Sequence, residues 1–152
     1  MLGLAGAIFS GWFSDRFFNA KRNVPALIMG ILLTTSLLGL QAAPQNNFIF
    51  NVAALGLFEF TLGSLVVYIG GLWAVDLLPT KAAGSVKGII GIFSYIGAAT
   101  QDWISGLLIE NSKTTVNGIE NYNFDTVFTF WIVSSVIAIL IPLSLWKEKS
   151  KE

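Results

Sequence analysis

Long apolar runs decide what this chain can fold into. A helix needs about 20 predominantly apolar residues to cross the hydrocarbon core of a bilayer. Four runs reach that length: Val24–Ala43, Phe48–Trp73, Ala82–Ile109 and Val127–Trp146. A fifth run, Met1–Phe13, is shorter, and we interpret it as the second half of a truncated span. The sequence therefore predicts an all-α protein of polytopic membrane helices.

The composition agrees with this interpretation. Hydrophobic residues make up 54% of the chain, charged residues 12%, and the mean hydropathy is +0.70. A soluble helical bundle is the alternative, but apolar runs of this length are rare outside bilayers. The formal net charge is zero, which gives no indication of nucleic-acid binding. The chain has no cysteine or histidine and no nucleophile–base pattern, so we expect no enzyme, cofactor or metal site.

The basic residues predict an orientation. They gather on alternate connections: Arg16, Lys21 and Arg22 in the first (Ser14–Asn23), Lys81 and Lys87 at the third, and Lys147, Lys149 and Lys151 in the tail. Lys113 is the exception, in the connection Glu110–Thr126, which we expect to be a solvated external loop. Loops rich in lysine and arginine stay on the cytoplasmic side. The pattern predicts a multi-pass protein with a cytoplasmic C-terminus.

Two segments resemble a known family. Gly11-Trp12-Phe13-Ser14-Asp15-Arg16, followed by Lys21-Arg22, resembles the signature cytoplasmic loop of the major facilitator superfamily. The second segment resembles the junction of the tenth and eleventh helices in organophosphate:phosphate antiporters, which carry glycerol phosphate and hexose phosphates. It comprises DLLPTKAAGS from Asp76 to Ser85, then Gly88, Gly91, Phe93, Tyr95 and Gly97.

The resemblance implies a place within such a transporter. The chain would contain the end of helix eight and all of helices nine to twelve, in a bacterial inner membrane. A first-half alternative fits less well, because the chain ends in a short basic tail after its fifth apolar run. The implied partners are the lipid bilayer, a missing N-terminal transporter half, a phosphorylated small-molecule substrate and inorganic phosphate.

The resemblance also assigns roles to the first loop. It implies that Gly11 permits a close helix approach and that four charged residues form a gate at the cytoplasmic side: Asp15, Arg16, Arg22 and Asp76. Our hypothesis is that Arg16 and Asp76 form a latch. The alternative is that the basic residues only fix the topology.

Small and polar residues recur along one face of the run Ala82–Ile109. At intervals of three and four they are Gly84, Gly88, Gly91, Tyr95, Ala98, Asp102 and Gly106. Such spacing predicts one stripe on a helix. We interpret Gly84, Gly88 and Gly91 as a helix-packing seam. A second line beside it is a candidate border of a water-filled pathway: Lys87, Ser94, Gln101 and Ser105. The alternative for Lys87, which we favour, is that its side chain extends to the nearby cytoplasmic interface.

Four polar residues within the runs are candidates for the substrate pathway: Glu59, Tyr95, Gln101 and Asp102. A carboxylate at the centre of a span costs about 2.5–3.5 kcal/mol on insertion scales, so it usually faces a cavity or a partner. Asp102 either lines the pathway or is a paired packing residue. Glu59 either lines the pathway, pairs with a cation or becomes protonated. Tyr68 lies on the opposite face from Glu59, which predicts a lipid-facing or packed side chain.

Three functions follow from these observations. The first is the C-terminal portion of a secondary-active transporter that exchanges a sugar phosphate or glycerol phosphate for inorganic phosphate by alternating access. The second is a transporter-like membrane sensor of sugar phosphates. The third is an inactive truncated remnant, because the polar faces of an isolated piece would meet lipid.

Overall fold

The chain forms five α-helices and one small hairpin over the residues that the structure describes. In this computed structural model these are residues 1–19, 21–43, 47–72, 80–116 and 119–144. The elements in chain order are α1 (Leu2–Phe18), α2 (Asn23–Ala42), α3 (Phe48–Val67), the π-helical turn η1 (Tyr68–Leu72), α5 (Thr80–Asn111), β1 (Thr114–Val116), β2 (Ile119–Asn121) and α6 (Asp125–Ser144). The prediction of an all-α membrane architecture is confirmed.

Three of the helices are long and apolar enough to cross a membrane: Asn23–Ala42, the continuous segment Phe48–Leu72 and Lys81–Asn111. The described apolar part of α6 is shorter, Asp125–Leu140. The fourth predicted span, Val127–Trp146, ends outside the described residues and stays a prediction.

The first helix continues beyond its apolar run. We expected a loop from Ser14, but α1 extends through Phe18 and ends at Asn19, whose φ and ψ are both 48°. Asparagine tolerates this left-handed conformation, and its N–H bonds the Ser14 carbonyl, as at a helix C-terminus. The apolar run ends where the helix meets charged residues, because hydropathy marks the membrane boundary and not the end of the helix.

Helices α1 and α3 cross in close contact because glycines face each other there. A Cβ added at Gly6 would overlap the Phe60 carbonyl of α3, and one added at Gly63 would overlap the Gly3 carbonyl of α1. Small residues permit this backbone approach, and it is a recurrent mode of helix packing in membranes.

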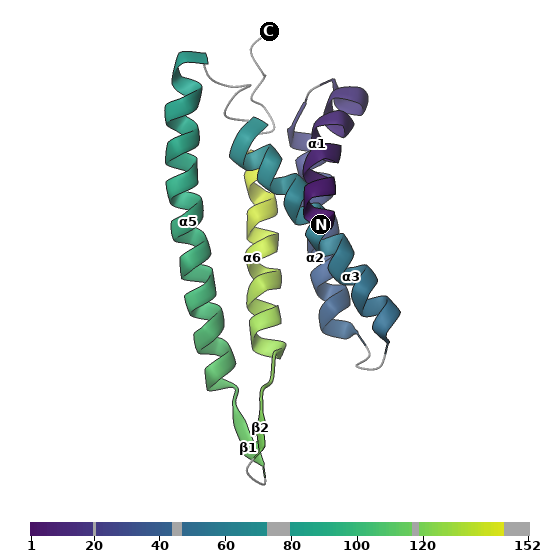
Figure 1. Cartoon of the computed structure of the whole chain (residues 1–152), viewed down its shortest axis with the longest axis vertical. Coiled ribbons are helices and arrows are strands. Elements are labelled where there is room, and N and C mark those ends of the chain that lie inside the picture. The colour runs from purple at the N-terminus through teal and green to yellow at the C-terminus, as the bar shows by residue number, and fades with distance from the viewer. Residues whose placement is uncertain (20, 44–46, 73–79, 117–118, 145–152) are drawn as a thin grey trace.

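One face of α2 forms the core against α3 and α6. Its buried apolar side chains recur at helical spacing, at Ala26, Met29, Leu33 and Leu37. Tyr68 of η1 is fully buried in the same cluster as Ala26 and Met29. The helices α1, α2, α3 and α6 therefore form one packed group, at the centre and right of Figure 1.

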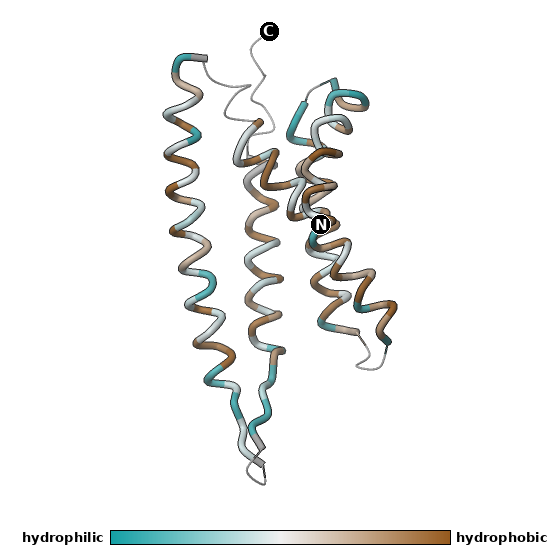
Figure 2. Tube along the Cα trace, in the orientation of Figure 1, coloured by the Kyte–Doolittle hydropathy of each residue, from teal (hydrophilic) through white to brown (hydrophobic). Residues whose placement is uncertain are grey.

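Helix α5 stands at the side of this group. None of its spanning window is buried within the chain. Figure 1 shows α5 beside α6, antiparallel to it and joined to it through the hairpin. The strands pair antiparallel, with Thr114 opposite Asn121 and Thr115 opposite Glu120. In Figure 2 the hairpin and several turns of α5 are hydrophilic, whereas α3 and α6 are largely hydrophobic.

Candidate functional site

An ion pair closes the connection between α1 and α2. An Arg22 guanidinium nitrogen donates to Oδ1 of Asp15 at 2.6 Å, with 10% of the Arg22 side chain exposed and 62% of the Asp15 side chain exposed. The hydroxyl of buried Ser14 donates to the Lys21 carbonyl at 3.5 Å across the same connection. Two of the predicted gate residues are thus brought together.

The other predicted gate residues are not joined to this pair. Arg16 is exposed at the end of α1, and Asp76 lies outside the described residues, so the latch between them stays a prediction. No described atom lies within 4 Å of the position that a Cβ would take at Gly11. The close approach expected there is found instead at Gly6.

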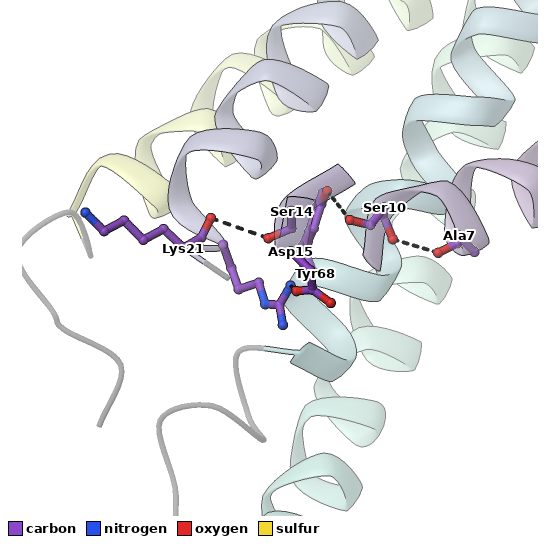
Figure 3. Close-up of polar contacts among 7 residues, drawn as sticks. Ala7, Ser10, Ser14, Asp15, Lys21 and Tyr68 are labelled. Atoms are coloured by element: carbon purple, nitrogen blue, oxygen red, sulfur yellow. Dashed lines mark hydrogen bonds and ion pairs between the residues drawn. The ribbon is translucent and has the colours of Figure 1, made fainter. Parts of the chain in front are cut away.

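A polar seam that the sequence interpretation missed holds α1 against α3 and η1. Ser64 donates from its hydroxyl to the Gly6 carbonyl at 2.9 Å, and Tyr68 donates to the Ser10 carbonyl at 2.7 Å. Figure 3 shows Tyr68 reaching the turn of α1 that carries Ser10 and Ser14. Of the two alternatives for Tyr68, the packed one is correct, because its face of the helix meets α1. Small residues at Gly6, Ser10 and Ser14, spaced by four, are the signal that could have located this seam.

The four candidate pathway residues lie in two separate places. Glu59 is exposed on α3 beside α1, where a Cβ added at Gly3 would lie 3.7 Å from its carboxylate Oε2. Tyr95, Gln101 and Asp102 are exposed on α5, and the residue Tyr95 is 81% accessible. No described contact joins Glu59 to the residues on α5.

The predicted packing seam on α5 has no described partner. A Cβ added at Gly84, Gly88 or Gly91 would meet no described atom within 4 Å. The seam stays a prediction, and any helix that packs against it is not among the described residues of this chain.

Two hydrogen bonds connect helices through α6. The indole nitrogen Nε1 of Trp131 donates to the Ser105 hydroxyl on α5 at 2.9 Å. One turn further along α6, the Ser135 hydroxyl shares a hydrogen bond with Thr34 of α2 at 2.9 Å. Helix α6 thus contacts both α5 and α2.

A cavity of about 40 Å³ lies between α2, α3, η1 and α6, with mostly apolar lining that includes Gly30, Leu65 and Ala138. Binding sites for small molecules are clefts of roughly 300–1,000 Å³, so this space is too small for a sugar phosphate. Among the described residues no cluster of three or more acidic, histidine or cysteine side chains could hold a metal ion.

The hairpin carries a charged cluster at the opposite end of the bundle from the α1–α2 connection (Figure 1). Lys113 Nζ lies 2.7 Å from Oε1 of Glu120, and that hydrogen bond raises the pKa of Lys113 above its ordinary value. The Tyr122 hydroxyl donates to Oε2 of the same carboxylate at 3.0 Å, which raises the pKa of Tyr122. The predicted solvated loop is therefore a folded hairpin.

Known proteins resemble the whole chain. It is 31% identical to the glycerol-3-phosphate transporter of Bacillus subtilis over 148 residues, covering 95% of this chain and 30% of that protein. It is 33% identical over 113 residues to the membrane sensor protein UhpC of Salmonella typhimurium, covering 71% of this chain and 24% of that protein. It is 34% identical over 95 residues to the hexose-6-phosphate:phosphate antiporter of Escherichia coli, covering 61% of this chain and 19% of that protein.

The chain belongs to the organophosphate:phosphate antiporter family of the major facilitator superfamily. No family model and no solved structure matches it. The relatives within the antiporter family are transporters and sensors, not enzymes, in agreement with the prediction from sequence. The chain spans about 30% of the length of the glycerol-3-phosphate transporters to which it is similar.

Proposed function

We propose that this chain is the C-terminal part of a secondary-active transporter that exchanges a sugar phosphate or glycerol phosphate for inorganic phosphate by alternating access. The relatives support the substrate class, since they include a glycerol-3-phosphate transporter and a hexose-6-phosphate:phosphate antiporter. The remaining transporter helices, in an N-terminal half, are the proposed partner.

The polar face of α5 is the observation that carries this proposal. Tyr95, Gln101 and Asp102 are exposed along a helix of which the spanning window is not buried within the chain. A carboxylate facing lipid there would cost about 2.5–3.5 kcal/mol on insertion scales. Transporters bind substrate between two halves near the bilayer midplane, and this face would line that space. Glu59, on α3, is a fourth candidate residue of the same pathway.

The test is exchange by the full-length protein in liposomes loaded with phosphate, measured as uptake of labelled glycerol 3-phosphate or glucose 6-phosphate. We expect Asp102→Asn and Tyr95→Phe to lower uptake at least tenfold at equal protein content. The matched control is Phe93→Leu, nine residues and therefore about 180° around α5 from Asp102, which should keep normal uptake. Normal uptake by both polar variants would remove these residues from the pathway.

A sensor of sugar phosphates is the second candidate, favoured by the identity of this chain to the membrane sensor protein UhpC. A sensor would bind the phosphorylated ligand without exchanging it. Saturable binding of labelled glucose 6-phosphate to the purified protein, together with no uptake in loaded liposomes, would select the sensor.

The proposed orientation places the α1–α2 connection and the C-terminal tail in the cytoplasm of a bacterium. The basic residues Arg16, Lys21 and Arg22 support it, since they lie at the opposite end of the bundle from the hairpin. The chain has no cysteine, so single reporters can be added at Lys21→Cys and Thr115→Cys. An impermeant maleimide should label only position 115 on intact cells; the reverse pattern would invert the orientation.

The proposed gate at the cytoplasmic end includes Gly11, the Asp15–Arg22 pair and the latch between Arg16 and Asp76. If Arg16 and Asp76 attract each other in one transport state, Arg16→Asp and Asp76→Arg should each abolish exchange, and the double exchange of charges should restore it. If the double variant does not restore exchange, the latch is wrong, and the role that remains for the basic residues is to fix the membrane topology.

A further inference from the structure

Helix α5 carries three of the four candidate pathway residues, yet it has little contact with the rest of the chain. Its described side chains make one hydrogen bond to another helix, the bond that Trp131 of α6 donates to Ser105. Ser105 is also the one buried residue of α5 among those described, with 6% of its surface exposed. The described side chains therefore tie α5 to another helix through this hydrogen bond.

The contact lies one turn from two candidate pathway residues. Gln101 and Asp102 precede Ser105 by four and three residues, and side chains at these spacings are neighbours on a helix surface. A rotation of α5 that breaks the Ser105 contact must swing both of them by the same angle. The hydroxyl that faces Trp131 thus fixes where Gln101 and Asp102 point.

The donor is itself held in place. The Trp131 ring packs edge-on against Phe128, with ring centroids 5.4 Å apart and an interplanar angle of 77°. One turn along α6, Ser135 bonds Thr34 of α2. Two hydrogen bonds that lie one turn apart on α6 therefore join this helix to α2 on one side and to α5 on the other.

A hydrogen bond has a specific role at such a place in a bilayer. Lipid tails are as apolar as leucine, so burying apolar surface between two helices does little to hold them in one orientation. The exposed side chains of α5, such as Ile92, Phe93 and Ile96, can contact lipid and another helix equally well. The directional bond between indole and hydroxyl distinguishes one rotation of α5 from the others.

We propose that Trp131 is a positioning residue, which acts through Ser105 to set the rotation of α5 and so aims Gln101 and Asp102 into the substrate pathway. That Gln101 and Asp102 face a substrate pathway rests on the proposed transport function. The positioning of α5 does not, and it can be measured without any transport assay.

The experiment uses the full-length protein, with any cysteine outside this chain replaced, and a reporter at Gln101→Cys. The rate of labelling by a water-soluble methanethiosulfonate reports how far this side chain faces water. We expect Trp131→Phe and Ser105→Val to change that rate at least threefold in the same direction. Ser105→Thr has the shape of Ser105→Val but keeps the hydroxyl acceptor, and it should restore the rate of the parent protein.

The double variant Trp131→Phe/Ser105→Val should label at the rate of either single variant, because both remove the same bond. A second reporter, Lys21→Cys in the distant α1–α2 connection, should label at an unchanged rate in every variant and so shows an intact fold. Unchanged labelling at position 101, or equal effects of valine and threonine at position 105, would overturn the proposal.

Transport kinetics test whether the position of α5 matters for substrate binding, and they distinguish a failure of this inference from a failure of the proposed function. If the parent protein exchanges phosphate, Trp131→Phe should raise the KM for the phosphorylated substrate about three- to tenfold with a smaller effect on the maximal rate. An unchanged KM would show that Trp131 does not orient Gln101 and Asp102 toward the substrate. If the parent protein exchanges nothing, the proposed function fails, while the labelling rates still decide whether Trp131 positions α5.

Discussion

Single glycines decide how closely α1 and α3 approach. A methyl group at Gly63 would overlap the Gly3 carbonyl, and backbone atoms of two helices cannot move aside as a side chain can. We expect Gly63→Ala to lower the free energy of unfolding by about 1–3 kcal/mol or more, as overpacking does. The control is Gly39→Ala, where the new Cβ would lie 3.8 Å from Phe50, an ordinary contact. Thermal unfolding of the full-length protein in detergent measures both, and equal melting temperatures would show that the α1–α3 crossing is looser than described.

The Tyr68 hydroxyl stabilises the same crossing from its other end. Tyr68→Phe removes the bond to the Ser10 carbonyl and changes nothing else in the ring. Polar bonds between membrane helices contribute about 0.6 kcal/mol on average and at most about 1.7 kcal/mol, so a loss in that range is expected from thermal unfolding. Tyr95→Phe, on the exposed face of α5, should leave the melting temperature unchanged. A Tyr68→Phe protein as stable as the parent would mean that the buried ring alone holds α1.

At the scale of elements, the hairpin depends on Glu120, which pairs with both Lys113 and Tyr122. Glu120→Gln should speed amide hydrogen exchange of residues 114–121 about two- to fivefold, the range for an exposed ion pair. Glu110→Gln is the matched control, because its carboxylate lies 4.0 Å from Lys113. If both variants speed exchange equally, the hairpin does not depend on the specific pairing of Lys113 with Glu120.

The pH dependence of the hairpin follows from the raised pKa of Lys113. Because folding raises this pKa, the contribution of the pair is fully present below the ordinary value of 10.5 and is lost as the pH rises through the raised value. Amide exchange in the hairpin, corrected for intrinsic rates, should therefore show constant protection from pH 7 to pH 9. A loss of protection within that range would contradict the pair as its cause.

The elements also show which features a sequence can predict. Hydropathy located the helices well, because a spanning helix needs a long apolar run whatever its neighbours are. Glycine spacing predicts a seam at Gly84, Gly88 and Gly91, where a Cβ would meet no described atom, whereas the glycines that pack closely among the described residues are Gly6 and Gly63. A small residue permits close approach but does not specify a partner, and the partner is a property of the tertiary fold.

Two further features were not predicted, and only the first of them has a signal in the sequence. In the sequence, the segments that form β1 and β2 are separated by Asn117-Gly118, a dipeptide typical of tight hairpin turns, but we had interpreted this connection from its polarity alone. The Trp131–Ser105 bond joins residues 26 positions apart on two helices. Its existence depends on the rotation of both helices, which no periodicity within either one determines.

For the whole molecule, the polar face of α5 predicts opposite effects in the isolated chain and in the complete protein. Alone in a bilayer, this chain exposes Gln101 and Asp102 to lipid, and the carboxylate by itself costs about 2.5–3.5 kcal/mol. The double variant Gln101→Leu/Asp102→Leu should therefore lengthen the half-life of the chain expressed by itself, measured by pulse-chase. If the proposed function is correct, the same double variant should abolish phosphate exchange in the full-length protein, because the proposed pathway would lie between this face and the remaining helices. A longer half-life in both forms, with exchange intact, would mean that this face of α5 meets lipid in the complete transporter as well.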